Sequence, residues 1–453
     1  MYKFTIKELL LATNGKLLKG SINDEIDDIS IDSRVIKQTS LYIPIIGETH
    51  DGHKFLDNAY ESGCRTFLID KKHKYNKNDI NLIEVKDTTK AFGYISKYYK
   101  EKFSIKTIGI TGSVGKTSTR DMVYSVVKEK YNTFKNEGNF NNEIGIPKTL
   151  LNLNNDYEYQ VLEMGMSYKN EIKHLANLTN PDIAIISNIG MSHIEHFKNQ
   201  KGIFDAKMEI TNNFNKNSIL IVNGDDEYLK TLKTKKLKYK VLTYGFNSYN
   251  DIYCNNYKIK EDSIEFTCII NEKCEKFIIP TPAKHNILNA MAGILVGLLL
   301  DIDIKDIKKG LKTFELTKMR LDISMKGKRR IINDCYNASC DSMISALDVL
   351  SHYEERKVAI LGDIFETGKY EEEIHRKVGK NTIGKTDILI TIGNSSKYIY
   401  DEAIKEGFNK VNAYHFNTKE EFIKESKKIL KDNDTILLKA SRGMSLETLL
   451  EIL

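Results

Sequence analysis

A glycine-rich turn between an apolar strand and a helix constrains this chain more than any other feature. Residues 106–111 are predicted to form a strand, and a helical pattern follows at 120–130. Between them stands the run Gly112-Ser113-Val114-Gly115-Lys116-Thr117-Ser118. Glycines let backbone N–H groups approach an anion closely, and a helix N-terminus adds a favourable dipole. The run therefore predicts an ATP-binding phosphate loop, with Lys116 against the β- and γ-phosphates and the Thr117 hydroxyl on Mg²⁺.

This loop has the short form T-G-x-x-G-K-T, because Ile110 stands where the strict pattern has its leading glycine. The alternative is a glycine-rich turn with a chance lysine, which the preceding strand and the following helix disfavour. A nucleic-acid motor would need the leading glycine and a basic track, and neither is evident.

The order of strands and helices predicts an α/β protein of three domains. Its length of 453 residues fits about three domains by the usual size of a domain. Residues 1–103 are predicted to be a small mixed α/β domain, with strands near 40–45 and 65–69 and a helix near 54–62.

Residues 104–314 are predicted to be the central domain, a mostly parallel sheet covered by helices. Its expected strands are 106–111, 160–163, 183–187, 218–222 and 240–244. Residues 251–280 alternate as strands without a helix and predict an antiparallel appendage, before an apolar helix at 286–300.

Residues 315–453 are predicted to be a second doubly wound, Rossmann-like domain, entered through a linker at 315–322. Its expected strands are 330–333, 358–361, 387–392, 411–415 and 435–438, each followed by a helical pattern.

The bulk composition predicts a cytoplasmic protein that binds neither nucleic acid nor a membrane. The net charge of +6 is small for this length, and the lysine-rich stretches are predicted to be solvated faces. The N-terminus lacks the pattern of a signal peptide, and the longest apolar run, Ala290–Leu300, is too short to span a bilayer. The six cysteines form no C-x-x-C pair and are expected to be reduced thiols.

Seven further segments, taken in order, resemble motifs of one known family. They are Asp32-Ser33-Arg34; Gly47-Glu48-Thr49-His50-Asp51-Gly52-His53-Lys54-Phe55; Glu137-Gly138-Asn139-Phe140-Asn141-Asn142 with Gly145 and Pro147; Leu162-Glu163-Met164-Gly165; His285-Asn286-Ile287-Leu288-Asn289-Ala290; Asp334-Cys335-Tyr336-Asn337-Ala338; and Leu361-Gly362-Asp363-Ile364-Phe365-Glu366. Together with the loop they resemble the Mur ligases, the cytoplasmic enzymes that build the peptidoglycan stem peptide, and among these the branch that adds D-alanyl-D-alanine. The resemblance extends over essentially the full chain.

The chain departs from the family pattern at a few motif edges. Asn333 stands for the usual first acid before Asp334, and Ser339-Cys340 stands for Asn-Pro. Asn170 stands for a glycine, and Thr367 for a leucine. These departures affect the fine geometry of the motifs and not the expected reaction.

The resemblance implies an ATP-dependent ligase that forms an amide bond through an acyl phosphate. ATP would phosphorylate the terminal carboxylate of UDP-N-acetylmuramoyl-tripeptide, and the amine of D-alanyl-D-alanine would then attack the acyl carbon. The N-terminal domain would bind the uridine diphosphate, and ATP would lie between the central and C-terminal domains. The resemblance further implies a monomer whose domains close around the substrates.

The family's metal ligands carry over to Glu163, His193 and a carbamylated Lys207, which with Thr117 would hold magnesium, in two ions. From the sequence alone Lys207 would be an exposed helical lysine. His193, Glu195 and His196 could also suggest zinc, but their spacing is not that of H-E-x-x-H.

The resemblance also implies contacts with the nucleotide and the uridine substrate. Asn286 and Asn289, three apart on one helix face, would recognise adenine, although Asn286 could instead cap the helix. Arg320, Asp334, Tyr336 and Asn337 would complete the nucleotide site, and Lys439, Ser441 and Arg442 would face the same cleft. Substrate contacts are expected from Ser33, Arg34, Asp51, Gly52, His53, Asn139, Asn141 and Asn142, for which a turn or a polar loop is the alternative.

Two other functions remain open from the residues. One is a different amino-acid ligase of the same superfamily, disfavoured by the lack of a D-N-P-R tetrapeptide and by the G-K-T form of the loop. The other is a nucleotide-binding subunit without catalysis, which the intact Lys116, Thr117, Glu163, His193 and Lys207 disfavour.

Overall fold

The computed structural model describes residues 3–47 and 50–453. Glu48 and Thr49, part of the second motif above, lie outside the described residues. The chain divides into two compact units. The first comprises the segment ending at Gly109 together with Asn132–Met166 and Asn170–Pro181, and the second comprises Ile110–Tyr131, Ser167–Lys169 and Asp182–Leu453. The domain boundaries at 103/104 and 314/315 stay predictions.

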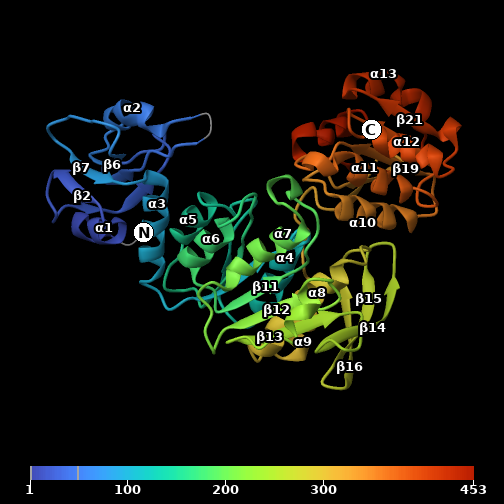
Figure 1. The fold of residues 1–453 in the computed structure, drawn as a ribbon, viewed down its shortest axis with the longest axis horizontal. Coiled ribbons are helices and arrows are strands. Elements are labelled where there is room, and N and C mark those ends of the chain that lie inside the picture. Colours follow the sequence, from blue (N-terminus) through green and yellow to red (C-terminus); the bar gives the residue numbers. More distant parts are fainter. Residues whose placement is uncertain (1–2, 48–49) are drawn as a thin grey trace. The chain divides into compact units, whose positions relative to one another are not determined.

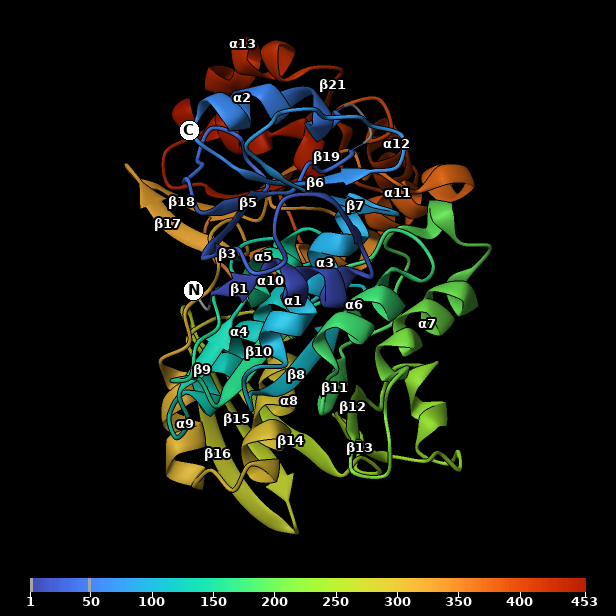
Figure 2. The same ribbon diagram turned by 90° about the vertical axis from the view of Figure 1, so that its left-hand side faces the viewer.

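The N-terminal part of the first unit is built on a five-stranded sheet. Its order is β2 (Lys16–Lys19), β7 (Asn81–Val85), β6 (Thr66–Asp70), β5 (Ser40–Tyr42) and β4 (Asp28–Ser30), with only β2 antiparallel to its neighbour. Figure 2 shows β5, β6 and β7 side by side. Strands β1 (Phe4–Thr5) and β3 (Glu25–Ile26) form a separate pair next to α1 (Ile6–Thr13), which a Thr5–Glu8 capping box begins. The mixed α/β fold predicted for this part is confirmed.

The predicted helix near 54–62 begins later than expected. Residues Gly52–Phe55 form the 3-10 turn η1, and the α-helix α2 runs from Leu56 to Glu61. The Asp51 carboxylate accepts a hydrogen bond from the N–H of His53 and so caps the turn (3.0 Å). The first residues of the predicted helix, 54 and 55, therefore belong to the 3-10 turn.

The rest of the first unit packs helices on α3 (Thr88–Lys100), whose N-terminus Asp87 caps. Helices α5 (Gly145–Leu150) and α6 (Glu171–Thr179) lie against α3 (Figures 1 and 2). The short strand β9 (Thr133–Lys135) pairs in parallel with β10 (Tyr159–Glu163). The sequence predicted β10 but not β9.

The second unit contains the phosphate loop and the sheet beside it. The chain enters through β8 (Lys106–Thr111) and continues into α4 (Lys116–Val127). Strands β11 (Ile183–Ile186), β12 (Ile219–Asn223), β13 (Lys240–Gly245) and β14 (Ile252–Ile259) pair in parallel. Strands β15 (Ile264–Ile270) and β16 (Lys273–Ile279) then add antiparallel pairs, which confirms the appendage.

Two helices that come much later in the chain cover α4. They are α8 (Asn286–Leu299) and α9 (Ile304–Lys312). A Cβ at Gly293 would lie 3.5 Å from the Met122 backbone, and one at Gly297 would lie 2.9 Å from the Val126 side chain. Because these glycines have no side chain, α8 approaches α4 closely, and both helices bury their apolar faces.

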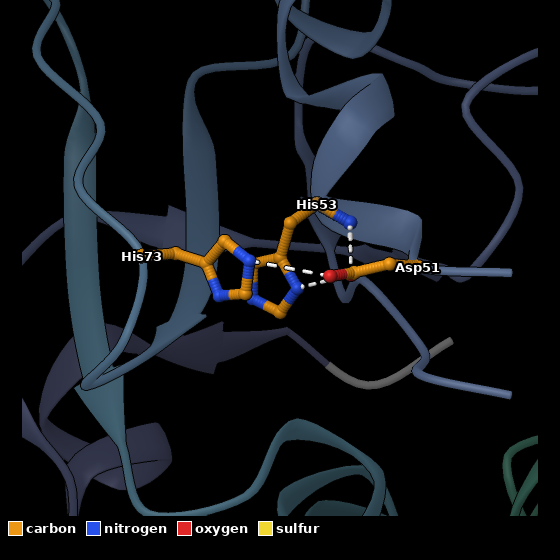
Figure 3. A group of neighbouring side chains, drawn as sticks. All are labelled: Asp51, His53 and His73. Atoms are coloured by element: carbon orange, nitrogen blue, oxygen red, sulfur yellow. Dashed lines mark hydrogen bonds and ion pairs between the residues drawn. The ribbon is translucent and has the colours of Figure 1, made fainter.

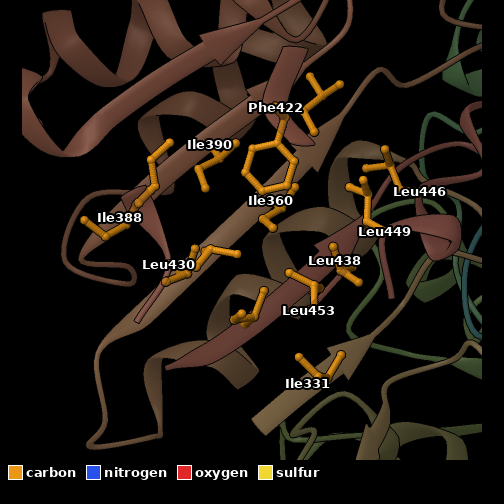
Figure 4. Packing of buried hydrophobic residues seen from close by; sticks show 14 of the residues in the cluster. Ile331, Ile360, Ile388, Ile390, Phe422, Leu430, Leu438, Leu446, Leu449 and Leu453 are labelled. Carbon is orange, nitrogen blue, oxygen red and sulfur yellow. The ribbon is translucent and has the colours of Figure 1, made fainter. Parts of the chain in front are cut away.

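The C-terminal sheet has six strands. Its order is β17 (Asp322–Lys326), β18 (Arg329–Asn333), β22 (Thr435–Lys439), β19 (Lys357–Gly362), β20 (Ile388–Ile392) and β21 (Ala413–Phe416). Helices α10 (Cys340–Ser351), α11 (Glu371–Lys380), α12 (Lys397–Lys405) and α13 (Lys419–Ile429) surround it (Figure 1). Figure 4 shows its core, where Ile360, Ile390 and Leu438 meet Phe422 and Leu449. The predicted doubly wound domain is confirmed.

The predicted linker was wrong at its end. Asp322 already begins β17, which pairs antiparallel with β18 across a turn at Gly327 (φ +60°). Strand β17 is an edge strand with no buried residue, so it lacks the alternation that marks a half-buried strand.

Two further expectations concern the cysteines and membrane spans. All six cysteines are free thiols, and only Cys274 is exposed. Among the helices of the described ranges, none combines the length and the apolar character that crossing a bilayer would require.

Candidate active site

The phosphate loop links β8 to the N-terminus of α4, and two of its glycines are required by close contacts. Gly115 has φ +80°, and a Cβ there would lie 2.9 Å from Asn289 Oδ1. A Cβ at Gly112 would lie 1.9 Å from Ser187 Oγ. Ile110, which stands for the leading glycine of the strict pattern, is a fully buried strand residue. The short loop therefore begins only where the strand ends.

Asn188 holds this loop, and the sequence analysis missed it. Its Oδ1 accepts hydrogen bonds from the backbone N–H groups of Ser113 (3.1 Å) and Val114 (2.9 Å), and its Nδ2 donates to Val114 O (3.1 Å). The Ser187 hydroxyl also donates to Val114 O (2.6 Å). Two of the N–H groups expected to bind phosphate thus bind an amide oxygen. Asn188 follows β11 directly, so the rule that polar residues after parallel strands build sites could have found it.

The first turn of α4 presents the remaining donors of the loop. The first intrahelical bond runs from Thr119 N–H to Gly115 O (2.8 Å), so the N–H groups of residues 116–118 precede it. Lys116 Nζ donates to the carbonyls of Gly112 (3.0 Å) and Ser113 (3.3 Å), which curls its side chain back over the loop. The ammonium is therefore held beside the turn where a phosphate would bind.

Replacing Asn188 with alanine should raise the KM for ATP. The change leaves the Val114 N–H without its acceptor, whereas the Ser113 N–H keeps the Asn188 backbone carbonyl (3.1 Å), and about 1–3 kcal/mol is typical for an N–H group that loses its acceptor. We expect a KM about tenfold higher, measured by phosphate release at varied ATP concentration. Asn152→Ala, which removes an exposed amide that donates only to Lys148 O, is the matched control. An unchanged KM in Asn188→Ala would contradict a role for this amide in shaping the loop.

Lys207 lies near Lys116 in α7 (Gln200–Met208) and is buried, not exposed as its sequence context alone suggested. Only 2% of its surface is accessible. Burial, followed by the nearby charge of Lys116, holds the pKa of Lys207 well below its usual value. No carboxylate is among the groups that shift this pKa, so both causes, burial and the Lys116 charge, act against the ammonium form.

Glu163 is the last residue of β10, in the first unit, and is 2% accessible. Asn141 Nδ2 donates to Glu163 Oε1 (2.8 Å), and the Glu163 N–H donates to Asn136 Oδ1 (2.9 Å). Asn136, which the sequence analysis did not single out, also donates to the carbonyls of Phe140 and Glu163. The Asn141 amide holds the Glu163 carboxylate, and the Asn136 amide holds the Glu163 backbone at the end of the strand.

His193 follows β11 in a left-handed conformation (φ +61°). Its Nδ1 lies 2.5 Å from Glu366 Oε2, which is within ion-pair distance. The two groups are not aligned for a hydrogen bond. This contact lowers the pKa of the Glu366 carboxyl. The sequence analysis quoted Glu366 in a motif without giving it a role.

The zinc alternative at His193 finds no support. Within residues 3–47 and 50–453, the group of side chains spaced to hold a metal is Asp51, His53 and His73. The His196 ring instead packs on Tyr168, with 4.3 Å between ring centroids.

A cavity of about 300 Å³ adjoins His193 and Glu366. Asn337, Ser441 and Arg442 also line it, so three residues predicted to face the nucleotide cleft share one cavity with His193. The Ser441 hydroxyl accepts a hydrogen bond from Phe365 N–H (2.9 Å), and Arg442 pairs with Glu447 (2.7 Å).

Replacing Glu366 with glutamine should weaken the response to magnesium. The resemblance implies that His193 binds magnesium, and losing a group that orients a metal-binding histidine typically changes metal affinity about 10- to 100-fold. We expect the Mg²⁺ concentration for half-maximal activity to rise by about tenfold or more, while the KM of the uridine substrate stays unchanged. Glu425→Gln, an exposed carboxylate paired with Lys428, is the control. An equal rise in both constants would argue for a general distortion instead.

The predicted C-terminal nucleotide residues lie together. Lys439 is 1% accessible and donates to Asp334 Oδ2 (2.5 Å) and Asn337 O (3.0 Å). The Arg320 guanidinium lies 4.0 Å from the centroid of the Tyr336 ring. Leu321 N–H donates to Asp334 Oδ1 (3.1 Å), which ties this cluster to the segment before β17.

Asn286 and Asn289 are buried and bonded to each other, with Asn289 Nδ2 donating to Asn286 Oδ1 (2.8 Å). The Thr119 hydroxyl donates to Asn289 Oδ1 (3.0 Å), so the amides brace α8 against α4. The capping alternative was wrong, because His285 occupies the N-cap and no side chain caps α8. Contact with adenine stays a prediction.

The predicted substrate residues lie in the first unit, and several have structural partners. Arg34 is exposed and forms two hydrogen bonds to Asp32 (2.9 and 2.7 Å), which lower the pKa of Asp32 to about 2. A Cβ at Gly52 would lie 2.7 Å from Ile45 N, so close packing requires this glycine. The His53 side chain is 2% accessible.

The other predicted substrate residues differ in their surroundings. Asn142 Oδ1 accepts from Gly145 N–H (2.8 Å) at the start of α5, and Asn141 binds Glu163 as described. Asn139 is exposed, and Ser33 is half-buried. Substrate contact by all these residues stays a prediction.

Comparisons with known proteins agree along the chain. Residues 25–100 match the Mur ligase family, catalytic domain; residues 110–297 match the Mur ligase middle domain; and residues 319–442 match the Mur ligase, glutamate ligase domain. A protein of Bacillus subtilis named UDP-N-acetylmuramoyl-tripeptide–D-alanyl-D-alanine ligase is 37% identical, covering 100% of this chain and 98% of its own length. The Escherichia coli protein of the same name is 29% identical over 100% of this chain and 99% of its own length.

Solved structures give the same result for the fold. The crystal structure of MurF from Acinetobacter baumannii has a TM-score of 0.92 at 27% identity, covering 100% of this chain and 99% of that one. MurF ligase from Thermotoga maritima, solved in complex with ADP, has a TM-score of 0.83 at 24% identity, covering 94% and 96%, and shows the fold alone. The chain belongs to the Mur ligase family, and the curated relatives that match its whole length are UDP-N-acetylmuramoyl-tripeptide–D-alanyl-D-alanine ligases.

Proposed function

We propose that the chain is an ATP-dependent ligase that joins D-alanyl-D-alanine to UDP-N-acetylmuramoyl-tripeptide in cytoplasmic peptidoglycan synthesis. The tripeptide carboxylate attacks the γ-phosphorus of ATP, and ADP leaves. The dipeptide amine then attacks the acyl carbon, the C–O bond to phosphate breaks, and the amine loses a proton as the amide forms. A carboxylate is a poor electrophile, so phosphoryl transfer from ATP supplies the phosphate leaving group. The protein acts as a monomer.

The loop residues have the chemistry this reaction needs. The N–H groups at the start of α4 and the Lys116 ammonium would bind the β- and γ-phosphates. The predicted magnesium ligands are the Thr117 hydroxyl, Glu163, His193 and Lys207 as its carbamate. Bound magnesium neutralises the charge that develops on the transferred phosphoryl group.

The environment of Lys207 supports its proposed carbamate. Only a neutral amine adds to CO₂, and burial lowers the pKa of Lys207 well below its usual value, which favours that form. The addition forms an N–C bond, releases one proton and converts the neutral amine into a carboxylate-like oxygen ligand. A buried lysine near a second ammonium and without a carboxylate to balance it would otherwise be unfavourable.

The main support for this proposal is the phosphate loop, with Lys207 buried near Lys116 and its pKa lowered. The full length of the chain also matches such ligases. The test is phosphate release from ATP and Mg²⁺ with both substrates, omitting each in turn. Release that needs both, with a pentapeptide product by mass, is expected. Release with a free amino acid but not the dipeptide would indicate another ligase of the superfamily, and no release in any combination would indicate a subunit without catalysis.

A further inference from the structure

Two imidazoles and two carboxylates meet around the 3-10 turn η1 in the N-terminal part of the chain. Asp51 and His53 lie at the start of η1, Asp70 ends β6, and His73 follows three residues later. Figure 3 shows the rings of His53 and His73 facing the Asp51 carboxylate. This cluster, Asp51, His53, Asp70 and His73, includes two residues, Asp70 and His73, that belong to none of the motifs discussed above.

Both rings converge on one carboxylate. His53 Nδ1 lies 2.8 Å from Asp51 Oδ1, and His73 Nε2 lies 3.2 Å from Asp51 Oδ2. The rings stack with their centroids 3.7 Å apart and their planes within 6° of parallel. One ligand atom from each of Asp51, His53 and His73 lies within 4.8 Å of the others. A tilt that opens the stack would direct the three donors at a single ion.

The second nitrogen of His73 determines what the cluster can bind. Nδ1 lies 2.7 Å from Asp70 Oδ1, which in turn accepts from Lys72 N–H (2.9 Å). A ring that donates Nδ1–H to Asp70 directs the lone pair of Nε2 toward Asp51. A lone pair and a carboxylate repel each other unless a cation lies between them, and that cation is either a proton or a metal ion.

His53 can supply its nitrogen at small cost. Its Nε2 has a long contact with Asp70 N–H (3.4 Å), so little is lost when the ring carries its proton there and frees Nδ1. Its side chain is 2% accessible, which fixes the ring in place. Asp51 and His73 are 29% and 31% accessible, which leaves a path by which an ion enters and an open position for water.

We propose that Asp51, His53 and His73 form a binding site for a divalent transition-metal ion of the zinc class, with Asp70 orienting His73. Two imidazoles and one carboxylate are a ligand set that zinc takes in proteins, and a carboxylate behind the histidine is its usual support. The bound ion ties η1 to the segment after β6. Asp51 and His53 are also predicted substrate residues, but the test of the metal site measures metal binding alone and so does not depend on the proposed ligase reaction.

The test is calorimetric titration of Zn²⁺ into the metal-stripped full chain, in excess Mg²⁺ to fill sites made of oxygen ligands. His73→Gln removes one ligand at a partly exposed position, and its circular dichroism reports whether the fold is kept. His352→Gln, an exposed histidine after α10, is the matched control. We expect the wild type and the control to bind one more equivalent than His73→Gln.

A second variant and a second readout keep the test decisive. Asp70→Asn keeps all three ligands and should weaken Zn²⁺ binding about 10- to 100-fold. Co²⁺ bound to the wild type should give visible absorption bands typical of nitrogen and oxygen ligation, which His73→Gln loses. Equal stoichiometry and affinity in the wild type, His73→Gln and Asp70→Asn would overturn the proposal and leave a proton shared between the imidazoles and carboxylates.

Discussion

Lys207→Gln should lower the rate of amide formation by about 10³-fold, because removing one group that stabilises transition-state charge typically costs 10²- to 10³-fold and the proposed carbamate would also hold the metal. Glutamine keeps a polar side chain that is one atom shorter, and its amide cannot add CO₂. The measurement is kcat for phosphate release with both substrates saturating.

The same experiment distinguishes the carbamate from a simple ammonium. Wild-type activity should fall in buffer purged of CO₂ and return when bicarbonate is added, whereas Lys207→Gln should respond to neither. Lys201→Gln, which changes an exposed lysine on the same helix paired with Asp205, is the control and should keep full activity. A Lys207→Gln enzyme that keeps more than a tenth of the wild-type kcat would contradict the proposed role of Lys207 as a carbamate that binds metal.

Asp121→Ala should cost about 3–5 kcal/mol of unfolding free energy, the range for breaking a buried ion pair. Arg120 and Asp121 on α4 are 2% and 3% accessible in their side chains and lie 2.8 Å apart. Asp121 also accepts from the Thr317 hydroxyl (2.7 Å), so it joins α4 to the segment before β17. Alanine leaves a buried guanidinium without this carboxylate.

Urea unfolding followed by circular dichroism measures this loss. Glu425→Ala breaks an exposed pair with Lys428 and should change stability by less than about 1 kcal/mol. A loss equally small in Asp121→Ala would mean that Arg120 reaches solvent or another acceptor in the variant. Thr317→Val, which removes only the hydroxyl donor, should be intermediate between the two.

Most strands were predictable because they are continuous apolar runs between turn residues. β8, β12, β19 and β22 were each predicted to within one or two residues of their ends. β9 and β17 were missed for physical reasons: β9 has three residues, and β17 buries none. A strand without an apolar face leaves no periodic signal, and its position is decided by the neighbour with which it pairs.

The site was predictable where its chemistry is local in the sequence. Gly115, Lys116 and Thr117 form one loop, and the strand before them sets their context. Asn188 could not be read in the same way, because its partners Ser113 and Val114 lie 75 and 74 residues away. Such a contact can be inferred only when the order of the strands in the sheet is known.

Lys207 shows where prediction from the local sequence fails. Its neighbours in the sequence suggest a solvated helical lysine, and only packing reveals that its amine is buried near Lys116. The resemblance to a family assigned it a role that its local pattern did not indicate. Burial depends on the whole fold, so the burial of Lys207 cannot be predicted from the few residues on either side of it.

The close packing of α8 on α4 has a consequence for how the protein is made. Thr119 on α4 bonds Asn289 on α8, 170 residues later in the chain. While the chain is being translated, the apolar face of α4 leaves the ribosome long before Gly293 and Gly297 exist to cover it. The nucleotide loop is therefore synthesised long before the helix that packs against it. In the interval the nascent chain exposes the apolar face of α4, which can associate with other chains.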